Sequence, residues 1–187
     1  KELWKTRLMK KIIFCQFFLL ICFCSHAQKF MSRSVKVSFF SKTPIENIEA
    51  VNSQVSSLFD SSTGEIVLQV PIKGFHFEKA LMEEHFNENY MESEEFPNAT
   101  LQGFVVDWES FSESDSGDIS VSGELTIHGV TVSRTFEGKI RIEDGKYVIQ
   151  SEFEVKTEDH QIEIPNLVRS QIAESIQVSV EGILTPR

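Results

Sequence analysis

Apolar and polar residues alternate along most of the chain beyond residue 28. Rows with an apolar side chain at every second position occupy residues 35–40, 66–72, 119–127, 136–142, 147–155 and 176–184. A period of two indicates β-strands that face a core on one side and water on the other. Seven or eight such strands at short spacing predict an all-β sandwich or barrel. A strand near each end of the sequence would let the sheet close and hide its edges, which favours the barrel. We therefore expect a closed antiparallel barrel of about eight strands.

Short polar stretches separate the rows. Asp144-Gly145 is typical of a tight hairpin, because both residue types tolerate the positive φ that such turns need. Residues 60–64 predict another turn. Residues 109–118 are rich in Ser, Asp and Glu, and residues 157–170 contain a proline and mixed polarity, so we expect both to be loops.

One segment departs from the alternation. Residues 78–91 contain no Gly or Pro and are rich in Glu, Leu, Ala, Met and Lys, which favour helix. Met82, Phe86 and Tyr90 lie four residues apart, so a helix would place them on one face, with Leu81 beside it. We expect one helix between strands, packed over one end of the barrel.

The N-terminal segment has the pattern of a secretory signal peptide. Lys10 and Lys11 precede an apolar run at residues 12–24, and Ser25-His26-Ala27 places small residues at the −3 and −1 positions of a cleavage site. The competing interpretation, a membrane anchor, needs about 20 apolar residues, which favours cleavage near Ala27. We expect residues 1–27 to form an N-terminal extension and signal peptide. Residues 28–187 then form one β-barrel domain, which is periplasmic or secreted in a bacterium.

Export changes the composition of the mature chain. The cysteines, at positions 15, 22 and 24, all fall within the signal, so the exported domain must be held by its own core. Lipidation at Cys22 or Cys24 is disfavoured by the bulky residue before each. Removing five basic residues and one acidic residue from a chain of net charge −10 leaves −14. An acidic surface repels nucleic acid, so we expect no nucleic-acid partner and no transmembrane anchor after cleavage. The oligomeric state, including a homodimer, stays open.

No pattern of catalytic or metal-binding residues stands out in the exported region. Its histidines lack metal-ligand spacing, and no Gly-x-Ser-x-Gly segment marks a serine nucleophile. Carboxylates crowd residues 83–95 so densely that a solvated face is the natural interpretation. We expect a protein that is not an enzyme, with no catalytic residues, no metal and no cofactor. An enzyme that relies on dispersed carboxylates or histidines is the remaining alternative.

The apolar rows leave the state of the barrel interior open. Closed barrels of about eight strands are either filled by side chains or keep a cavity for one small ligand. Gly123, Gly138 and Gly182 fall on apolar faces. Glycines there mark bends in the sheet or leave room beside a ligand, and the two interpretations are compatible.

Two motifs resemble those of the YceI-like family. The segment Leu125-Thr126-Ile127-His128-Gly129-Val130-Thr131 is similar to that family's signature. Upstream, residues 82–86 followed by residues 95–101 are similar to its acidic helix and the start of its next strand. The resemblance covers residues 30–184. It implies a lipocalin-like, eight-stranded exported barrel that binds a long isoprenoid chain, such as a polyprenyl phosphate or a quinone, in an apolar tunnel.

We therefore expect a protein that sequesters or carries an apolar lipid, with that bound lipid as its only ligand. The alternative is a ligand-free structural or stress-associated envelope protein whose barrel is packed solid. A tunnel would be lined by the inward face of the strands: Val37, Phe39, Ile66, Leu68, Val70, Leu101, Val105, Leu125, Ile127, Phe136, Ile140, Phe153, Val178 and Val180. His85 and His128 are candidate polar residues at its mouth. His128 could instead fix its turn by bonding backbone carbonyls.

Overall fold

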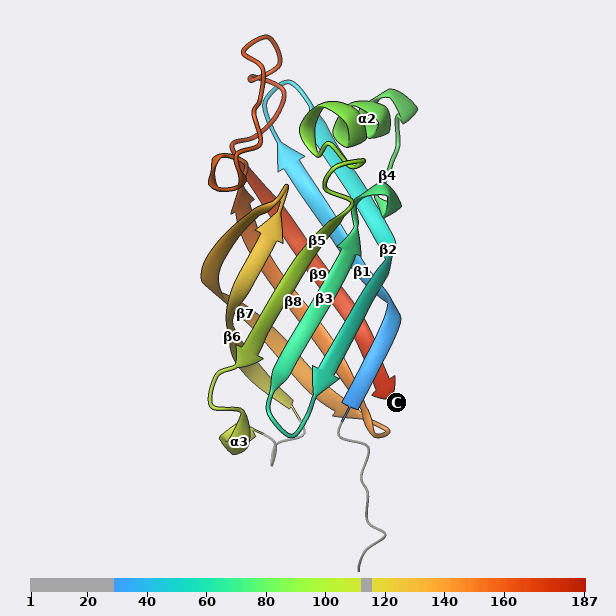
Figure 1. Cartoon of the computed structure of the whole chain (residues 1–187), viewed down its shortest axis with the longest axis vertical. Coiled ribbons are helices and arrows are strands. Elements are labelled where there is room, and N and C mark those ends of the chain that lie inside the picture. Colours follow the sequence, from blue (N-terminus) through green and yellow to red (C-terminus); the bar gives the residue numbers. More distant parts are fainter. Residues whose placement is uncertain (1–28, 112–115) are drawn as a thin grey trace, which may run out of the picture.

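The barrel wall consists of eight long strands. The computed structural model describes residues 29–111 and 116–187, and the predicted signal peptide lies outside these ranges. Within them the wall strands are β1 (Lys29–Lys42), β2 (Asn47–Asp60), β3 (Glu65–Pro71), β5 (Asn98–Val105), β6 (Ser116–Ile127), β7 (Val130–Glu143), β8 (Lys146–Lys156) and β9 (Ser175–Pro186). Each strand runs antiparallel to the next along the chain (Figure 1).

The wall closes through β1, which pairs with both β2 and β9. Val37 lies opposite Asn52 on β2 and opposite Val180 on β9. The predicted closed antiparallel barrel of eight strands is therefore confirmed. A further two-residue strand, β4 (His76–Phe77), pairs with the start of β2 outside this ring.

Both tight hairpins depend on residues that accept a positive φ. Asp144 and Gly145 have φ values of 50° and 71° and connect β7 to β8, as predicted. His128 and Gly129, at 51° and 73°, connect β6 to β7 in the same way. Two consecutive positive φ values define the type I′ turn, whose twist matches that of the strands it joins.

One end of the barrel is packed solid with aromatic side chains. The ring of Phe59 lies 5.0 Å from that of Trp108 and 5.0 Å from that of Tyr147, and Phe30 contacts Tyr147 at 4.6 Å. Trp108 belongs to a short helix, α3 (Trp108–Phe111), and its indole N–H donates to the carbonyl of Ser61 at 2.7 Å. The expectation of a loop over residues 109–118 was therefore wrong at both of its ends, because this helix and the start of β6 fall within it.

The other end carries a helix and a long loop. The predicted helix is confirmed as α2 (Ala80–His85), which continues into a π-helical turn, η3 (Phe86–Tyr90). Two short 3-10 turns, η2 (Ile72–Gly74) and η4 (Glu158–His160), lie at the ends of β3 and β8. Residues 161–174 form an irregular loop at the same end of the barrel as α2 (Figure 1). None of the helices in the described ranges is long and apolar enough to span a bilayer.

Candidate functional site: an apolar cavity in the barrel

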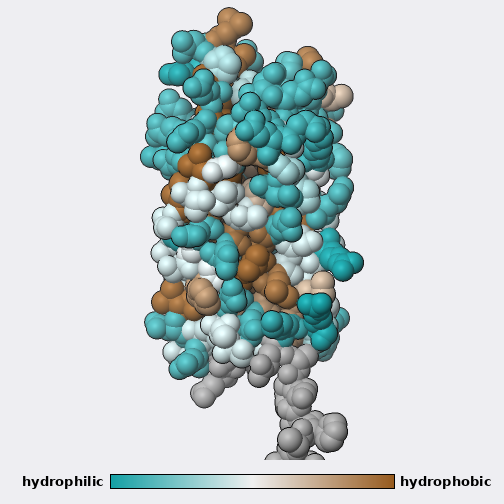
Figure 2. Space-filling view, viewed as in Figure 1, coloured by the Kyte–Doolittle hydropathy of each residue, from teal (hydrophilic) through white to brown (hydrophobic). Residues whose placement is uncertain are grey.

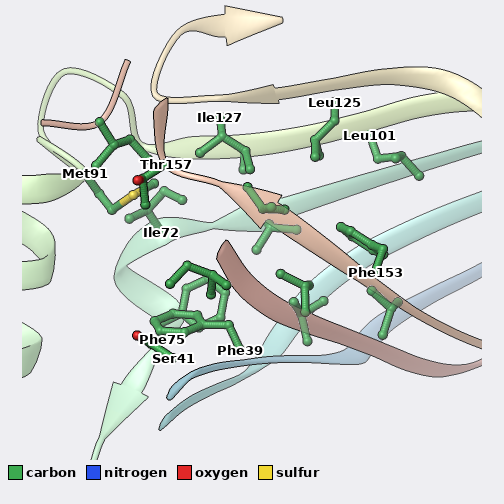
Figure 3. A pocket seen from close by; sticks show the side chains of 18 of the residues that line it. Phe39, Ser41, Ile72, Phe75, Met91, Leu101, Leu125, Ile127, Phe153 and Thr157 are labelled. Carbon is green, nitrogen blue, oxygen red and sulfur yellow. The ribbon is translucent and has the colours of Figure 1, made fainter. Parts of the chain in front are cut away.

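A cavity of about 340 Å³ occupies the half of the barrel nearest α2. Every wall strand contributes side chains to its lining, and these are mostly aliphatic or aromatic. Figure 3 shows Leu101, Leu125 and Phe153 facing the cavity from three strands, with Ile72 and Met91 at one end. Since the aromatic cluster fills the opposite end, the cavity is closed there and opens toward α2 and the loop 161–174.

Most of the predicted lining residues meet at this cavity. Twelve of the fourteen line it: Val37, Phe39, Ile66, Leu68, Val70, Leu101, Leu125, Ile127, Phe136, Phe153, Val178 and Val180. Val105 and Ile140 do not. They face inward as expected, 5% and 1% exposed, but they belong to the packed core beyond the cavity. Alternation indicates which way a side chain faces but not how deep along the barrel it lies, so the pattern does not separate these two residues from the other twelve.

The segments outside the barrel wall supply lining residues that the strand pattern did not identify. Phe75 and Phe77 lie between β3 and α2, and Phe86 lies in η3. Together with Phe39 they form a cluster of rings whose centroids are 5.1–5.7 Å apart. From the loop come further lining residues: Ile162, Ile164, Val168 and Ile172. Their apolar side chains at spacings of two and four residues were the available signal for this contribution.

Buried polar contacts hold the loop and η4 against the wall. Ser41 is 1% exposed, and its hydroxyl oxygen accepts from the backbone N–H of Ala173 at 2.9 Å. His160 is also 1% exposed, and its Nδ1 lies 3.0 Å from the carbonyl oxygen of Val130. Because both contacts join the loop region to separate strands, they fix the position of the loop beside the cavity.

Polar residues form a minority of the lining: Ser41, Glu46, His85, Tyr90, Thr100, Glu137, Lys139, Gln150, Ser151, Thr157 and Gln171. Thr157 faces the cavity near Met91 (Figure 3), and Tyr90 and Glu46 also lie along the lining. Glu46 accepts from Lys79 Nζ at 2.7 Å, and this hydrogen bond raises the pKa of Lys79. Across the described residues, no group of three His, Cys, Asp or Glu side chains is arranged to hold a metal ion.

The two candidate histidines differ in position. His85 lines the cavity. His128 does not; its Nε2 lies 2.7 Å from a carboxylate oxygen of Glu92, and its ring packs on Phe96 at 4.6 Å. His128 is therefore seen neither at the cavity mouth nor bonded to backbone carbonyls of its turn. It links the β6–β7 turn to the acidic segment after η3, residues 92–95.

The outer surface around the cavity is largely hydrophilic. Figure 2 shows hydrophilic side chains over most of the end that carries α2, with hydrophobic ones exposed over the middle of this face of the barrel. The described residues include isolated exposed apolar side chains on this end, among them Ile45, Leu81 and Leu167. The wall also exposes apolar side chains, among them Phe104 of β5 and Ile183 of β9.

A closed, eight-stranded antiparallel barrel with an apolar cavity at one end is the architecture of small-ligand-binding barrels of the lipocalin type. The family model described as YceI-like domain matches residues 27–183. The chain belongs to the YceI-like family.

Solved structures share the fold at low sequence identity. A polyisoprenoid binding domain from Saccharophagus degradans, implicated in plant cell wall breakdown, is 15% identical with a TM-score of 0.74, covering 87% of this chain and 100% of that one. BcnA from Burkholderia cenocepacia is 16% identical with a TM-score of 0.68, covering 81% and 96%. A Campylobacter jejuni YCEI protein is 15% identical with a TM-score of 0.59, covering 76% and 86%. Among curated proteins, none matches the chain.

Proposed function

We propose that this protein binds a single elongated apolar lipid, an isoprenoid chain, inside its barrel. The observation that carries the proposal is the cavity, which is lined mostly by aliphatic and aromatic side chains and closed at one end by the rings of Phe30, Phe59, Trp108 and Tyr147. A chain that enters from the α2 end would lie along the barrel axis. The polyisoprenoid-binding domain among the structural relatives supports an isoprenoid as the class of ligand.

The energy of binding would come from burial of apolar surface. Each methylene removed from water contributes about 0.8 kcal/mol. The cavity volume lies near the lower limit of typical small-ligand pockets. A long chain would therefore place one part in the cavity and leave the rest among Phe86, Met91 and the loop 161–174 at the mouth.

We further propose a binding role rather than a catalytic one, in an exported protein. The lining offers side chains suited to apolar contact and few that can exchange protons. The charged start, apolar run and small-x-small junction of residues 10–27 support export to the periplasm or beyond. Sequestration or transport of the lipid would then take place outside the cytoplasm.

Filling the cavity tests the proposal. Leu101 faces the cavity from β5, and the next residue, Gln102, points to solvent. Leu101→Trp would place a large ring in the space that the chain needs, whereas Gln102→Trp adds the same ring outside. We expect the isoprenoid alcohol farnesol to displace the neutral dye N-phenyl-naphthylamine from the wild type and from Gln102→Trp. For Leu101→Trp, its affinity should fall about tenfold or more.

Circular dichroism and thermal unfolding would show that both tryptophan variants remain folded. Equal farnesol affinity in the two folded variants would place the binding site outside the cavity. Absence of farnesol binding by the wild type would contradict the proposed function itself.

A further inference from the structure

The hydrogen-bond ladder between β7 and β8 covers only half of their length. It runs from Gly138 opposite Ser151 to Glu143 opposite Lys146. In contrast, β7 pairs with β6 back to Val130, and β8 pairs with β9 as far as Lys156. The barrel wall therefore has a seam, formed by residues 130–137 of β7 and residues 152–156 of β8, where neighbouring strands lack ladder bonds.

Side chains bridge this seam in place of the ladder. Ser151 donates its hydroxyl to the carbonyl oxygen of Glu137 at 2.5 Å. Arg134 donates through a guanidinium N–H to the carbonyl oxygen of Glu154 at 2.7 Å. At the mouth, Nδ1 of the His160 imidazole lies 3.0 Å from the carbonyl oxygen of Val130. Side-chain bonds of this kind can exchange partners without unfolding of either strand.

The cavity reaches the seam. Phe136 of β7 and Phe153 of β8 face each other across it, with ring centroids 4.9 Å apart, and both rings line the cavity. Gly138 and Ser151, where the ladder begins, also belong to the lining. Glu137, Lys139 and Gln150 line the cavity beside them, so its boundary at this point is polar.

Of the two basic residues in the seam, Lys156 is exposed, which leaves Arg134 as the cation beside the cavity. Arg134 adjoins the lining residues Phe136 and Phe153 but is not itself part of the lining. It is half-buried at an inward-facing position between Val132 and Phe136, and its guanidinium carbon lies 5.1 Å from the Phe136 centroid and 5.6 Å from that of Phe153. Among the described residues, no carboxylate lies within 4.0 Å of it. The nearest acidic residues along the strands accept hydrogen bonds elsewhere, Glu137 from Ser120 and Glu154 from Ser175. In a chain with 28 acidic and 18 basic residues, a half-buried arginine bonded only to a carbonyl is available for an anion.

We propose that the seam is a polar window of the cavity, at which Arg134 binds the anionic head of a single-chain lipid whose tail lies in the barrel. The head would be a carboxylate or a phosphate monoester, because the planar guanidinium matches both in a two-bond geometry. This inference rests on the proposed function. On binding, the head replaces the carbonyl of Glu154 as the acceptor of the hydrogen bond from Arg134. The rings of Phe136 and Phe153 then pack against the part of the lipid that joins head and tail.

A matched pair of probes tests the proposal. cis-Parinaric acid and its methyl ester share one fluorescent chain and differ in the charge of the head. The wild type should bind the acid more tightly than the ester at neutral pH. Arg134→Gln should weaken binding of the acid about tenfold or more while changing that of the ester less than about twofold. Arg141→Gln removes a charge from the same strand, at an exposed residue paired with Glu143, and should leave both affinities within about twofold.

Several outcomes would overturn the inference. One is a wild type that binds the ester as tightly as the acid, and this result does not depend on the folding of any variant. Another is an Arg134→Gln protein in which both probes weaken equally, which would make Arg134 a purely structural bridge. Displacement of cis-parinaric acid by inorganic phosphate alone would mean that Arg134 binds free anions rather than the head of a lipid. If the wild type binds farnesol but neither probe, or binds the ester without preference for the acid, the window alone is rejected. If it binds neither farnesol nor the probes, the proposed function fails as well.

Discussion

Asn52 shows how a single buried polar side chain positions part of the cavity. It is fully buried on β2; its amide nitrogen donates to the carbonyl of Pro71 at 2.8 Å, and its amide oxygen accepts from the N–H of Gln54 at 2.8 Å. A Cβ at Gly74 would lie 2.7 Å from the same amide, so only glycine fits there without rearrangement. Since η2 leads directly to Phe75, these contacts set the position of Phe75 and of the rings packed around it at the mouth of the cavity. A polar residue in an alternating strand gives no sign of such a role in the sequence.

Asp60 links stability to pH at the residue scale. Its carboxylate accepts from the hydroxyl of Ser62 at 2.5 Å and from its backbone N–H at 2.9 Å, and these bonds lower the pKa of Asp60. A folded-state pKa below the unfolded value means that the carboxylate stabilises the fold above about pH 4. That stability is lost as the pH falls through the lowered folded-state pKa. We expect Asp60→Asn to lower the free energy of unfolding by about 0.5–1 kcal/mol at neutral pH, and the deficit to shrink in acid.

Urea unfolding of wild type and Asp60→Asn at several pH values measures this difference. Ser62→Ala, which removes the hydroxyl donor but keeps the backbone one, should give a smaller deficit with the same pH dependence. A deficit that stays constant down to the most acidic pH would show that the charge of Asp60 plays no part.

At the scale of elements, the two type I′ hairpins have the same backbone geometry in different surroundings. Gly145 has φ 71° with no atom within 4 Å of where a Cβ would lie. Gly129 has φ 73°, but a Cβ there would lie 2.6 Å from the ring of Phe96. Gly129 therefore meets two requirements, the positive φ and the close approach of the segment after η3, whereas Gly145 meets only the first.

Alanine at these two glycines separates backbone strain from contact. Both variants place a Cβ in the left-handed region at a cost of about 1–2 kcal/mol. We expect Gly129→Ala to be more destabilising than Gly145→Ala by about 1 kcal/mol or more, because Phe96 must also move. Thermal or urea unfolding compares them directly. Equal destabilisation would mean that Phe96 moves aside at no cost, and that its contact with the turn does not fix the position of residues 92–95.

The elements that could be predicted are those with a strong local period. Alternation located six of the eight wall strands, all but β2 and β5, and Asp144-Gly145 located a hairpin, because both signals arise within a few neighbouring residues. The four-residue spacing of Met82, Phe86 and Tyr90 likewise predicted the helix that covers the mouth. The partial β7–β8 ladder has no such signal, since pairing between strands depends on the curvature of the whole wall.

At the scale of the whole molecule, the barrel divides into a packed end and an end with a cavity. Aromatic rings from α3, β1, β2 and β8 fill one end, and the cavity occupies the other. Val105 and Ile140 show why this division could not be predicted, since their strand positions look the same as those of the twelve residues that do line the cavity. Depth along the barrel depends on strand tilt and on where Trp108 and Tyr147 insert, neither of which a period of two encodes.

The central claim is that the cavity holds one lipid chain. Its most direct test is organic-solvent extraction of the purified, folded protein, with the extract quantified by mass spectrometry beside an extract of Leu101→Trp. We predict close to one apolar lipid per wild-type barrel, an isoprenoid, and several-fold less from the variant. Recovery of no lipid from the wild type, after expression in several bacterial hosts and after incubation with farnesol, would contradict the account.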